Sequence, residues 1–380
     1  MFNSKEKKEI LKREKGITLV ALVVTIIILL ILAGITISSL TKTGIFQKAN
    51  EAKQKSEEAE ENQTKILSEY ENELDKYISG NKTEVKKVAD NIGIVLSTTE
   101  NTTLEDAYGN KIVVPAGFKI TNDATTVNEG IVIEDTTLES TAGSQFVWVP
   151  VGTIYTDKER TDANKKIITL GRYDFNEITG VESVYSGSYI EEDREDTSMA
   201  LKNLGNTIAK NITNFKNSVA KNGGYYIGRY EARKNSSGAI TEVKNDTIWN
   251  NIYQPDAAMK SQNMYNSNKF TSDLINSYAW DTAITFIQKC TNNTNYANQA
   301  SLNNSLDQTG TTSDKQCNIF DMSSNILEWS TETSNSSDGP CIARGGEFAI
   351  NSRFTSNRIS GKNNQYFDRI GFRPILYVNN

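Results

Sequence analysis

Histidine is absent from this chain of 380 residues. Its absence excludes Ser-His-Asp and Cys-His catalytic arrangements, and it excludes zinc and copper sites that use imidazole ligands. Cysteine is scarce, because Cys290, Cys317 and Cys341 are the three in the chain, and their spacing fits no zinc signature. One disulfide with a free thiol and three buried thiols both remain open. Neither copper nor zinc is expected as a cofactor.

The chain also has no excess of positive charge. The chain has 41 Lys and Arg residues against 47 Asp and Glu residues, for a formal net charge of −6. No basic stripe follows the first 16 residues, whereas nucleic-acid-binding domains gather Lys and Arg on one face. Nucleic acid is therefore not an expected partner.

The longest stretch without charge runs from Ile17 to Thr41. As a helix it would span about 37 Å, enough to cross a hydrocarbon core of about 30 Å. The leader before it, residues 1–16, is rich in lysine, and such flanks tend to stay in the cytoplasm. The sequence predicts a transmembrane helix over 17–41, a single-pass cell-membrane localisation and an extracellular head. A signal anchor that keeps its leader is the alternative.

The junction Lys15-Gly16-Ile17 and the aliphatic run after it resemble the leader junction of type IV prepilins. The resemblance implies cleavage after Gly16 by prepilin peptidase, methylation of Ile17, and other pilin-like subunits as partners. Ala21 stands where prepilins usually carry a glutamate, which in hydrocarbon needs a partner charge. This departure favours a minor or tip pilin, or a pilin-like surface protein that does not polymerise, over a repeating filament subunit.

Residues 42–79 are dense in Glu, Lys, Gln and Ala and contain no proline, which predicts a helical stalk. Residues 80–103 are expected to form a linker. From residue 104 to 380, short β-branched and aromatic runs alternate with Gly, Asn and Asp. The predicted fold class is α+β, with a long N-terminal transmembrane and stalk helix followed by a head with much irregular structure.

Within the head, two helices are expected, over 197–222 and 281–290. Residues 234–269 and 291–315 are rich in Asn, Ser and Thr. Such stretches bury little apolar surface, so they are expected to be surface loops.

Five motifs follow one another along the head. They occupy residues 146–151 (FVWVPV), 223–231 (GGYYIGRYE), 319–329 (IFDMSSNILEW), 343–346 (ARGG) and 370–374 (IGFRP). Their order and spacing resemble the sulfatase-modifying-factor family, the formylglycine-generating-enzyme-like branch of the C-type lectin fold. The resemblance implies a C-type-lectin-like head. Gly345 and Gly346 permit tight backbone turns, and the aromatic residues supply apolar area.

The resemblance does not extend to the family's catalytic cysteines. These fall beyond the Gly-Gly motif, at positions occupied here by Ile350 and Thr355, and neither residue can form a thiolate or bind copper. The chain is therefore not expected to be a sulfatase-activating enzyme. An enzyme of this family with another chemistry remains an alternative.

The same resemblance implies a calcium site in the loop before Trp329. Its ligands would be the side chains of Asp321 and Glu328 and the backbone carbonyls of Ser324 and Ile326. Two carboxylates across a tight loop suit a cation that prefers oxygen ligands. The alternative is a loop without metal, in which Asp321 is a turn residue and Glu328 a buried hydrogen-bond acceptor.

The stretch before the closing Gly-Phe-Arg motif, residues 351–366, is called the window. It resembles the hypervariable, ligand-facing segment of proteins that retroelements diversify, and it offers adaptable polar groups with aromatic anchors. The predicted ligand-binding residues are Asn351, Ser352, Phe354, Ser356, Asn357, Ile359, Asn363, Asn364 and Tyr366.

These patterns predict a membrane-anchored surface protein whose head binds an extracellular protein or glycan, in adhesion or recognition. A variable binding protein diversified by a retroelement and a minor subunit of a type IV pilus or secretion pseudopilus are the alternatives. A structural explanation of the window is that the whole head is rich in Asn.

Overall fold

The computed structural model describes residues 23–32, 85–191 and 209–379, except 237, 302, 349, 363, 365 and 366. The chain divides into two compact units, 1–84 and 85–380, which are considered separately. In the first unit, residues 23–32 form a helix. The second unit contains every strand that the structure describes.

The structure contradicts the prediction of a long N-terminal helix. Residues 23–32 are helical. No helix in the described part of the chain is long and apolar enough to cross a membrane. The predicted fold class, the single-pass membrane localisation and the pilin-like anchor are corrected accordingly. The rest of 17–41, the stalk 42–79, and the processing residues Gly16 and Ile17 lie outside the described residues.

A six-stranded antiparallel sheet forms the centre of the second unit. In spatial order its strands are β13 (Phe270–Leu274), β20 (Pro374–Val378), β10 (Gly224–Gly228), β5 (Gln145–Pro150), β4 (Val132–Asp135) and β3 (Phe118–Ile120). Every residue of β10 is buried, as is every residue of β5 after Gln145. The sequences of these strands are nearly continuous apolar runs, because both faces of the sheet are covered and side chains on both faces are buried.

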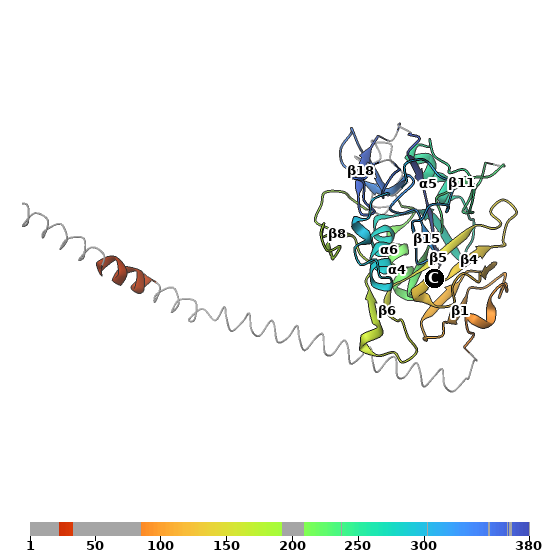
Figure 1. Cartoon of the computed structure of the whole chain (residues 1–380), viewed down its shortest axis with the longest axis horizontal. Helices are drawn as coiled ribbons and strands as arrows, with labels where there is room; N and C mark the ends of the chain where they lie inside the picture. The colour runs from red at the N-terminus through yellow and green to blue at the C-terminus, as the bar shows by residue number, and fades with distance from the viewer. Residues whose placement is uncertain are drawn as a thin grey trace, which may run out of the picture. The chain divides into compact units, whose positions relative to one another are not determined.

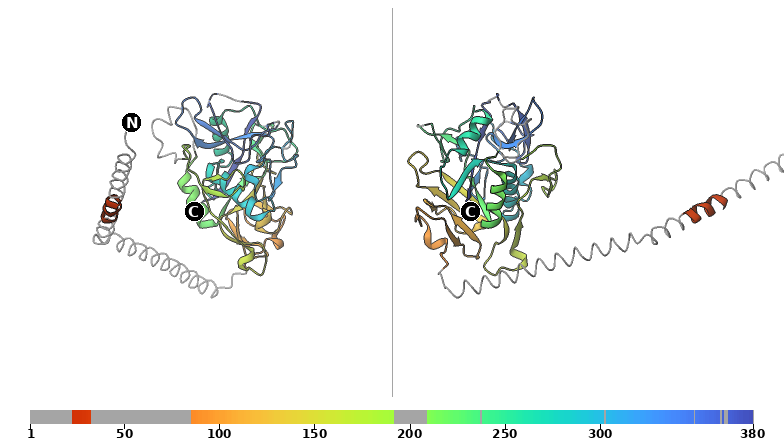
Figure 2. Two further views of the ribbon diagram at one scale, coloured as in Figure 1. Left: turned by 60° about the vertical axis from the view of Figure 1, so that its left-hand side comes forward. Right: turned by 180° about the vertical axis from the view of Figure 1, so that it is seen from behind.

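A four-stranded sheet carries the window. Its order is β18 (Arg358–Gly361), β17 (Cys341–Arg344), β16 (Leu327–Thr333) and β19 (Ile370–Phe372). Strand β19 runs parallel to β16, and the other pairs are antiparallel. All of β16 is buried, and the Trp329 Nε1 donates to the Ile252 carbonyl at 3.0 Å. Figures 1 and 2 show β18 at one end of the second unit and β1 and β6 at the other.

Three α-helices lie in the described part of this unit. Helix α4 (Ile212–Asn222) packs on β10 and β20, α5 (Gln254–Gln262) packs on β13, and α6 (Ser277–Cys290) contacts β5. Asn211 and Asn276 cap the N-termini of α4 and α6 by accepting backbone N–H groups. The prediction of a loop over 234–269 missed α5. Its sequence is largely polar, and packing against β13 supplies the stabilisation that its pattern does not reveal.

Short hairpins complete the unit. They are β1–β2 (Thr102–Glu105, Lys111–Val114), β6–β7 (Gly152–Tyr155, Lys165–Ile168), β8–β9 (Tyr173–Phe175, Glu182–Val184), β11–β12 (Arg233–Lys234, Ile240–Thr241) and β14–β15 (Lys315–Gln316, Ile319–Phe320). The 3-10 helices are η1 (Ala89–Asn91), η2 (Val127–Glu129), η3 (Asp162–Asn164) and η4 (Tyr296–Asn298). The five sequence motifs contain the strands β10, β15 and β19, most of β5, and parts of β16, β17 and β20.

Candidate functional site

A cavity of about 610 Å³ opens beside the window, and we call it the window cavity. Three segments that are distant in sequence form its walls: the β8 hairpin, the loop around η4, and residues 352–358 of the window. Its lining residues are Tyr173, Asp174, Phe175, Glu177, Asn295, Asn298, Ser352, Phe354, Ser356, Asn357 and Arg358.

Main-chain hydrogen bonds hold the window in place. The backbone N–H groups of Thr355 and Ser356 donate to the carbonyls of Gln299 and Ala297, at 3.1 and 3.0 Å. The Thr355 carbonyl accepts from Trp280 Nε1 at 2.8 Å. These bonds use backbone atoms of the window, so they do not require particular side chains at residues 355 and 356.

The Gly345-Gly346 turn brings the chain from β17 into the window. Gly345 has φ of +93°, a region that favours glycine. A Cβ at Gly346 would lie 1.9 Å from the Ser323 carbonyl oxygen, which is an impossible contact. The tight turn expected from the sequence is therefore also a close approach between two backbone segments.

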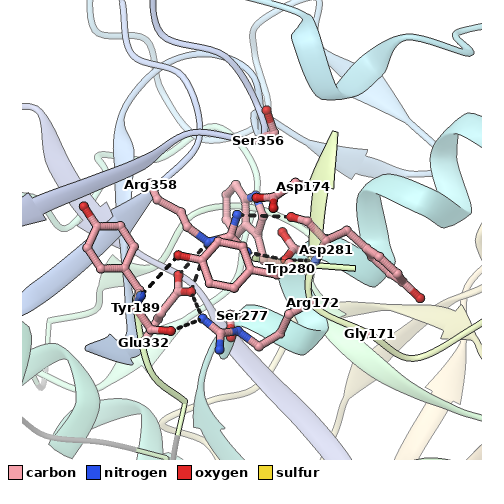
Figure 3. A network of polar contacts seen from close by, with 12 residues as sticks. Gly171, Arg172, Asp174, Tyr189, Ser277, Trp280, Asp281, Glu332, Ser356 and Arg358 are labelled. Carbon is pink, nitrogen blue, oxygen red and sulfur yellow. Dashed lines mark hydrogen bonds and ion pairs between the residues drawn. The ribbon is translucent and has the colours of Figure 1, made fainter. Parts of the chain in front are cut away.

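A network of buried ion pairs lies directly beneath the window cavity (Figure 3). Asp281 on α6 accepts from Arg344 and Arg358, each at 2.5 Å. Glu332 on β16 accepts from Arg358 Nε at 3.0 Å and from Arg172. Arg358 therefore ties the window strand to both a helix and the four-stranded sheet.

Three guanidinium groups share two carboxylates in this network. Burial alone would lower the pKa of Arg358, but Asp281 and Glu332 outweigh burial and raise it. The pKa of Arg344 is lowered, chiefly by burial and also by Arg358. The ring of Tyr185 also faces the guanidinium of Arg358, with 4.2 Å from Cζ to the ring centroid. The base of the cavity therefore consists of closely paired Arg, Asp and Glu side chains.

Apart from Arg358, the window side chains that line the cavity do little to hold the fold. Ser352 is exposed, and Phe354, Ser356 and Asn357 are half-buried. Neither the Ser352 nor the Ser356 hydroxyl forms a hydrogen bond to any residue that the structure describes. The Asn357 amide makes a 3.5 Å contact with the Ser352 carbonyl. These side chains are available to a ligand.

The other predicted ligand-binding residues lie elsewhere. Asn351 and Asn364 are exposed and do not line the cavity, whereas Ile359 on β18 packs against the hydrophobic core. Asn363 and Tyr366 lie outside the described residues. Sequence reasoning missed Arg358 and the opposite wall of the cavity, because nothing local to the window indicates that β8 and the η4 loop lie beside it.

The four residues predicted to bind calcium do not fit that ion. Both oxygens of the fully buried Glu328 carboxylate accept from Arg373, at 2.5 Å from Nη2 and 2.9 Å from Nε. Asp321 accepts from the Gly310 N–H at 3.0 Å and from the Thr312 hydroxyl. A cation at Glu328 would face the guanidinium at close range, in a buried environment that screens poorly.

Ser324 and Ile326, whose backbone carbonyls were predicted as calcium ligands, are also buried, with 2 % and 1 % of their surface exposed. Across the described residues, no cluster of three or more His, Cys, Asp or Glu side chains is arranged to hold a metal. Burial raises the pKa of Asp321 to about 6 and also raises that of Glu328, where Arg373 opposes the shift.

The positions of the family's catalytic cysteines are structural here. Thr355 is fully buried, and Ile350 is half-buried and bridges to Glu347. All three cysteines are free thiols, and burial raises the pKa values of Cys290 and Cys341 to about 12. Thiols of this kind are weak nucleophiles at neutral pH.

No family model matches the sequence, and no curated protein matches it either. A solved structure, Treponema denticola variable protein 1, matches with 11% identity over 68% of this chain and 98% of that chain, at a TM-score of 0.22.

Proposed function

We propose that this chain is a binding protein whose ligand site is the window cavity. One observation carries the proposal: Ser352, Phe354, Ser356 and Asn357 line one wall of the cavity while the backbone beneath them is held by buried partners. Adaptable polar side chains beside a rigid aromatic group are typical of surfaces built for recognition.

Different groups stabilise the window and face the cavity, and this supports the proposal. The scaffold contributes buried, mutually paired groups, such as Arg344 with Asp281. The window is tied to them through Arg358, whereas its residues Ser352, Ser356 and Asn357 form weak hydrogen bonds or none with the described residues. A site built in this way can change its window residues and keep its fold. This property favours a variable binding protein, and its genetic test is an adjacent reverse transcriptase with a near-copy of the codons for residues 349–369.

The β8–β9 hairpin, which contributes one wall of the window cavity, favours a protein ligand over a glycan. Ile178, Val181 and Val184 on the β8–β9 hairpin are 85%, 62% and 81% exposed. Exposed aliphatic groups beside a polar cavity are typical of protein-binding surfaces, whereas glycans offer few groups that would bury them. The β8 residues that line the cavity lie on the same hairpin.

The proposal is tested by selecting binders to the full chain from a random peptide display library and, in parallel, from a glycan array. Binders that occupy the window cavity should lose about tenfold or more in affinity on Phe354→Ala, if this ring is a buried anchor. Ser356→Tyr should block the cavity and abolish binding.

Lys158→Ala is the matched control, because this lysine is exposed and distant in sequence from all three walls of the cavity. If the chain binds a glycan and this binding depends on the window residues, the proposed ligand is a sugar and not a protein. Selected binders that ignore both window substitutions would contradict the proposed site.

A further inference from the structure

A second cavity, of about 770 Å³, lies apart from the window cavity and shares no lining residue with it. It is bounded by residues of β5, β14 and β15, by residues 229–230 directly after β10, and by the loops at 243–245 and 310–312. We call it the cationic cavity, because three of its four charged lining residues are Arg or Lys.

These cations surround one aromatic ring. Arg229 Cζ, Lys244 Nζ and Lys315 Nζ each lie 5.6 Å from the centroid of the Phe320 ring. The three charges are therefore less than twice that distance from one another. The Tyr230 ring lies 5.1 Å from that of Phe320, and both rings are almost completely buried. Each cation gains from the negative face of a ring, but the cations repel one another.

Among the described residues, one of these three cations has a carboxylate partner. Asp123 accepts from both terminal nitrogens of Arg229, at 2.8 Å each, and Gln145 accepts from the same guanidinium at 2.7 Å. Hydrogen bonding from Arg229 holds the pKa of Asp123 below its usual value. Within the described ranges, Lys244 and Lys315 form no ion pair. The lining therefore carries a surplus of two positive charges in a chain whose net charge is −6.

The base of the cavity is rigid while its two lysines are exposed. Arg229 is buried and is fixed by Asp123 and Gln145. At Gly310, φ is +64°, and a Cβ there would lie 2.3 Å from the Tyr230 ring, so the loop backbone rests directly on the aromatic floor. Exposed lysines over a fixed base can close on a ligand without disturbing the fold, and their ammonium groups bind phosphate and sulfate as point charges.

We propose that the cationic cavity binds an anionic group, a phosphate or a sulfate, between Lys244 and Lys315. A dianionic group matches the surplus of two charges, and it relieves the repulsion among the cations around Phe320. The cavity volume leaves room for the sugar or other small molecule that carries the group. This is a second ligand site, independent of the window.

Isothermal titration calorimetry of the full chain tests the proposal with two probes at constant ionic strength: inorganic pyrophosphate and a sulfated disaccharide. At least one should bind, and the tighter probe identifies the source of the anion. Lys244→Met combined with Lys315→Met should weaken binding at least tenfold. The affinity of each single variant should lie between that of the unmodified chain and that of the double variant. Binding should also weaken as sodium chloride is raised.

Lys158→Met is the control, because this side chain is 77% exposed and does not line the cavity. It should bind both probes as the unmodified chain does. Phe354→Ala should also leave anion binding unchanged, which separates this site from the window cavity. Failure of both probes to bind, or equal affinity in the double variant, would overturn the proposal.

Discussion

Arg358 joins the window to the scaffold beneath it. Its side chain is 9% exposed and bonds Asp281, Glu332 and the Tyr173 carbonyl. Two residues earlier, Ser356 lines the same cavity and its hydroxyl has no partner among the described residues. Within this short segment, Arg358 therefore stabilises the fold, whereas Ser356 is available to a ligand.

Arg358→Met should therefore destabilise the protein by about 3–5 kcal/mol, because it leaves two buried carboxylates short of a cation. Ser356→Ala should change the free energy of unfolding by no more than about 0.5 kcal/mol. Urea denaturation of the two variants beside the unmodified chain measures both. Equal losses would show that the window side chains hold the fold.

Glu242 is a buried carboxyl whose two oxygens have no hydrogen-bond partner among the described residues. Burial raises its pKa well above the ordinary value, and Arg373 opposes that shift only in part. Burial likewise raises the pKa of Asp321 to about 6. Such groups favour the protonated form in the folded state. Their contribution to stability is present below about pH 4 and is lost as pH rises through the folded pKa.

We therefore expect the free energy of unfolding to fall between pH 5 and pH 7.5. Glu242→Gln should flatten this dependence and stabilise the protein at pH 7.5 by about 1 kcal/mol or more, since one unit of pKa shift corresponds to about 1.4 kcal/mol. Urea denaturation at both pH values measures the effect. The exposed Glu139→Gln should show no such difference. Destabilisation by Glu242→Gln at pH 7.5 would mean that this carboxylate is ionised and paired.

At the scale of elements, the turn between β17 and the window depends on glycine for two reasons. Gly345 needs its positive φ, whereas Gly346 needs the space that a side chain would fill. The Gly-Gly motif is predictable from sequence, but the contact with the Ser323 carbonyl belongs to the tertiary structure.

Gly346→Ala should cost about 3 kcal/mol or more, because the backbone of residues 322–323 must shift to admit a methyl group. Gly93→Ala is the matched control: Gly93 has φ of +75°, and a Cβ at this position would meet no atom within 4 Å. Its cost should be about 1 kcal/mol, from backbone strain alone. Thermal melting of both variants makes the comparison, and equal costs would contradict the close approach at Gly346.

At the scale of the whole molecule, the compact unit begins before the first strand. Val88 is completely buried, and its N–H donates to the Glu105 carbonyl at 2.9 Å. The Gly93 N–H donates to the Ile120 carbonyl at 2.7 Å. The segment assigned from sequence to a linker over 80–103 thus packs, from residue 85, on the sheet that follows it.

A chain of residues 85–380 should consequently melt at the temperature of the full protein. A chain of residues 104–380 should lose at least about 2 kcal/mol, since burial of one valine alone contributes about 1.5–3 kcal/mol. Circular dichroism during heating measures both. Equal stability of the two chains would show that residues 85–103 do not belong to the folded unit.

Much of the β-rich head could be predicted from local pattern. The runs at 146–150 and 224–228 became the central strands β5 and β10, because β-branched and aromatic residues between turn signals favour buried strands. The caps Asn276 and Asn211 were not predicted, because the two helices were expected to begin at 281 and 197. The apolar run at 17–41 shows the limit of such reasoning, because its length indicated a membrane span that no described helix provides.

What the sequence alone determined is therefore the order of strands and turns, since these depend on neighbours within a few residues. Only the tertiary structure decided that Glu328 meets Arg373, 45 positions away. It also decided that β8, the η4 loop and the window enclose one cavity. The physical reason is that a buried carboxylate pairs with the cation that strand pairing brings next to it. Strand pairing joins segments that are far apart in the sequence, and no local pattern indicates which segments will meet.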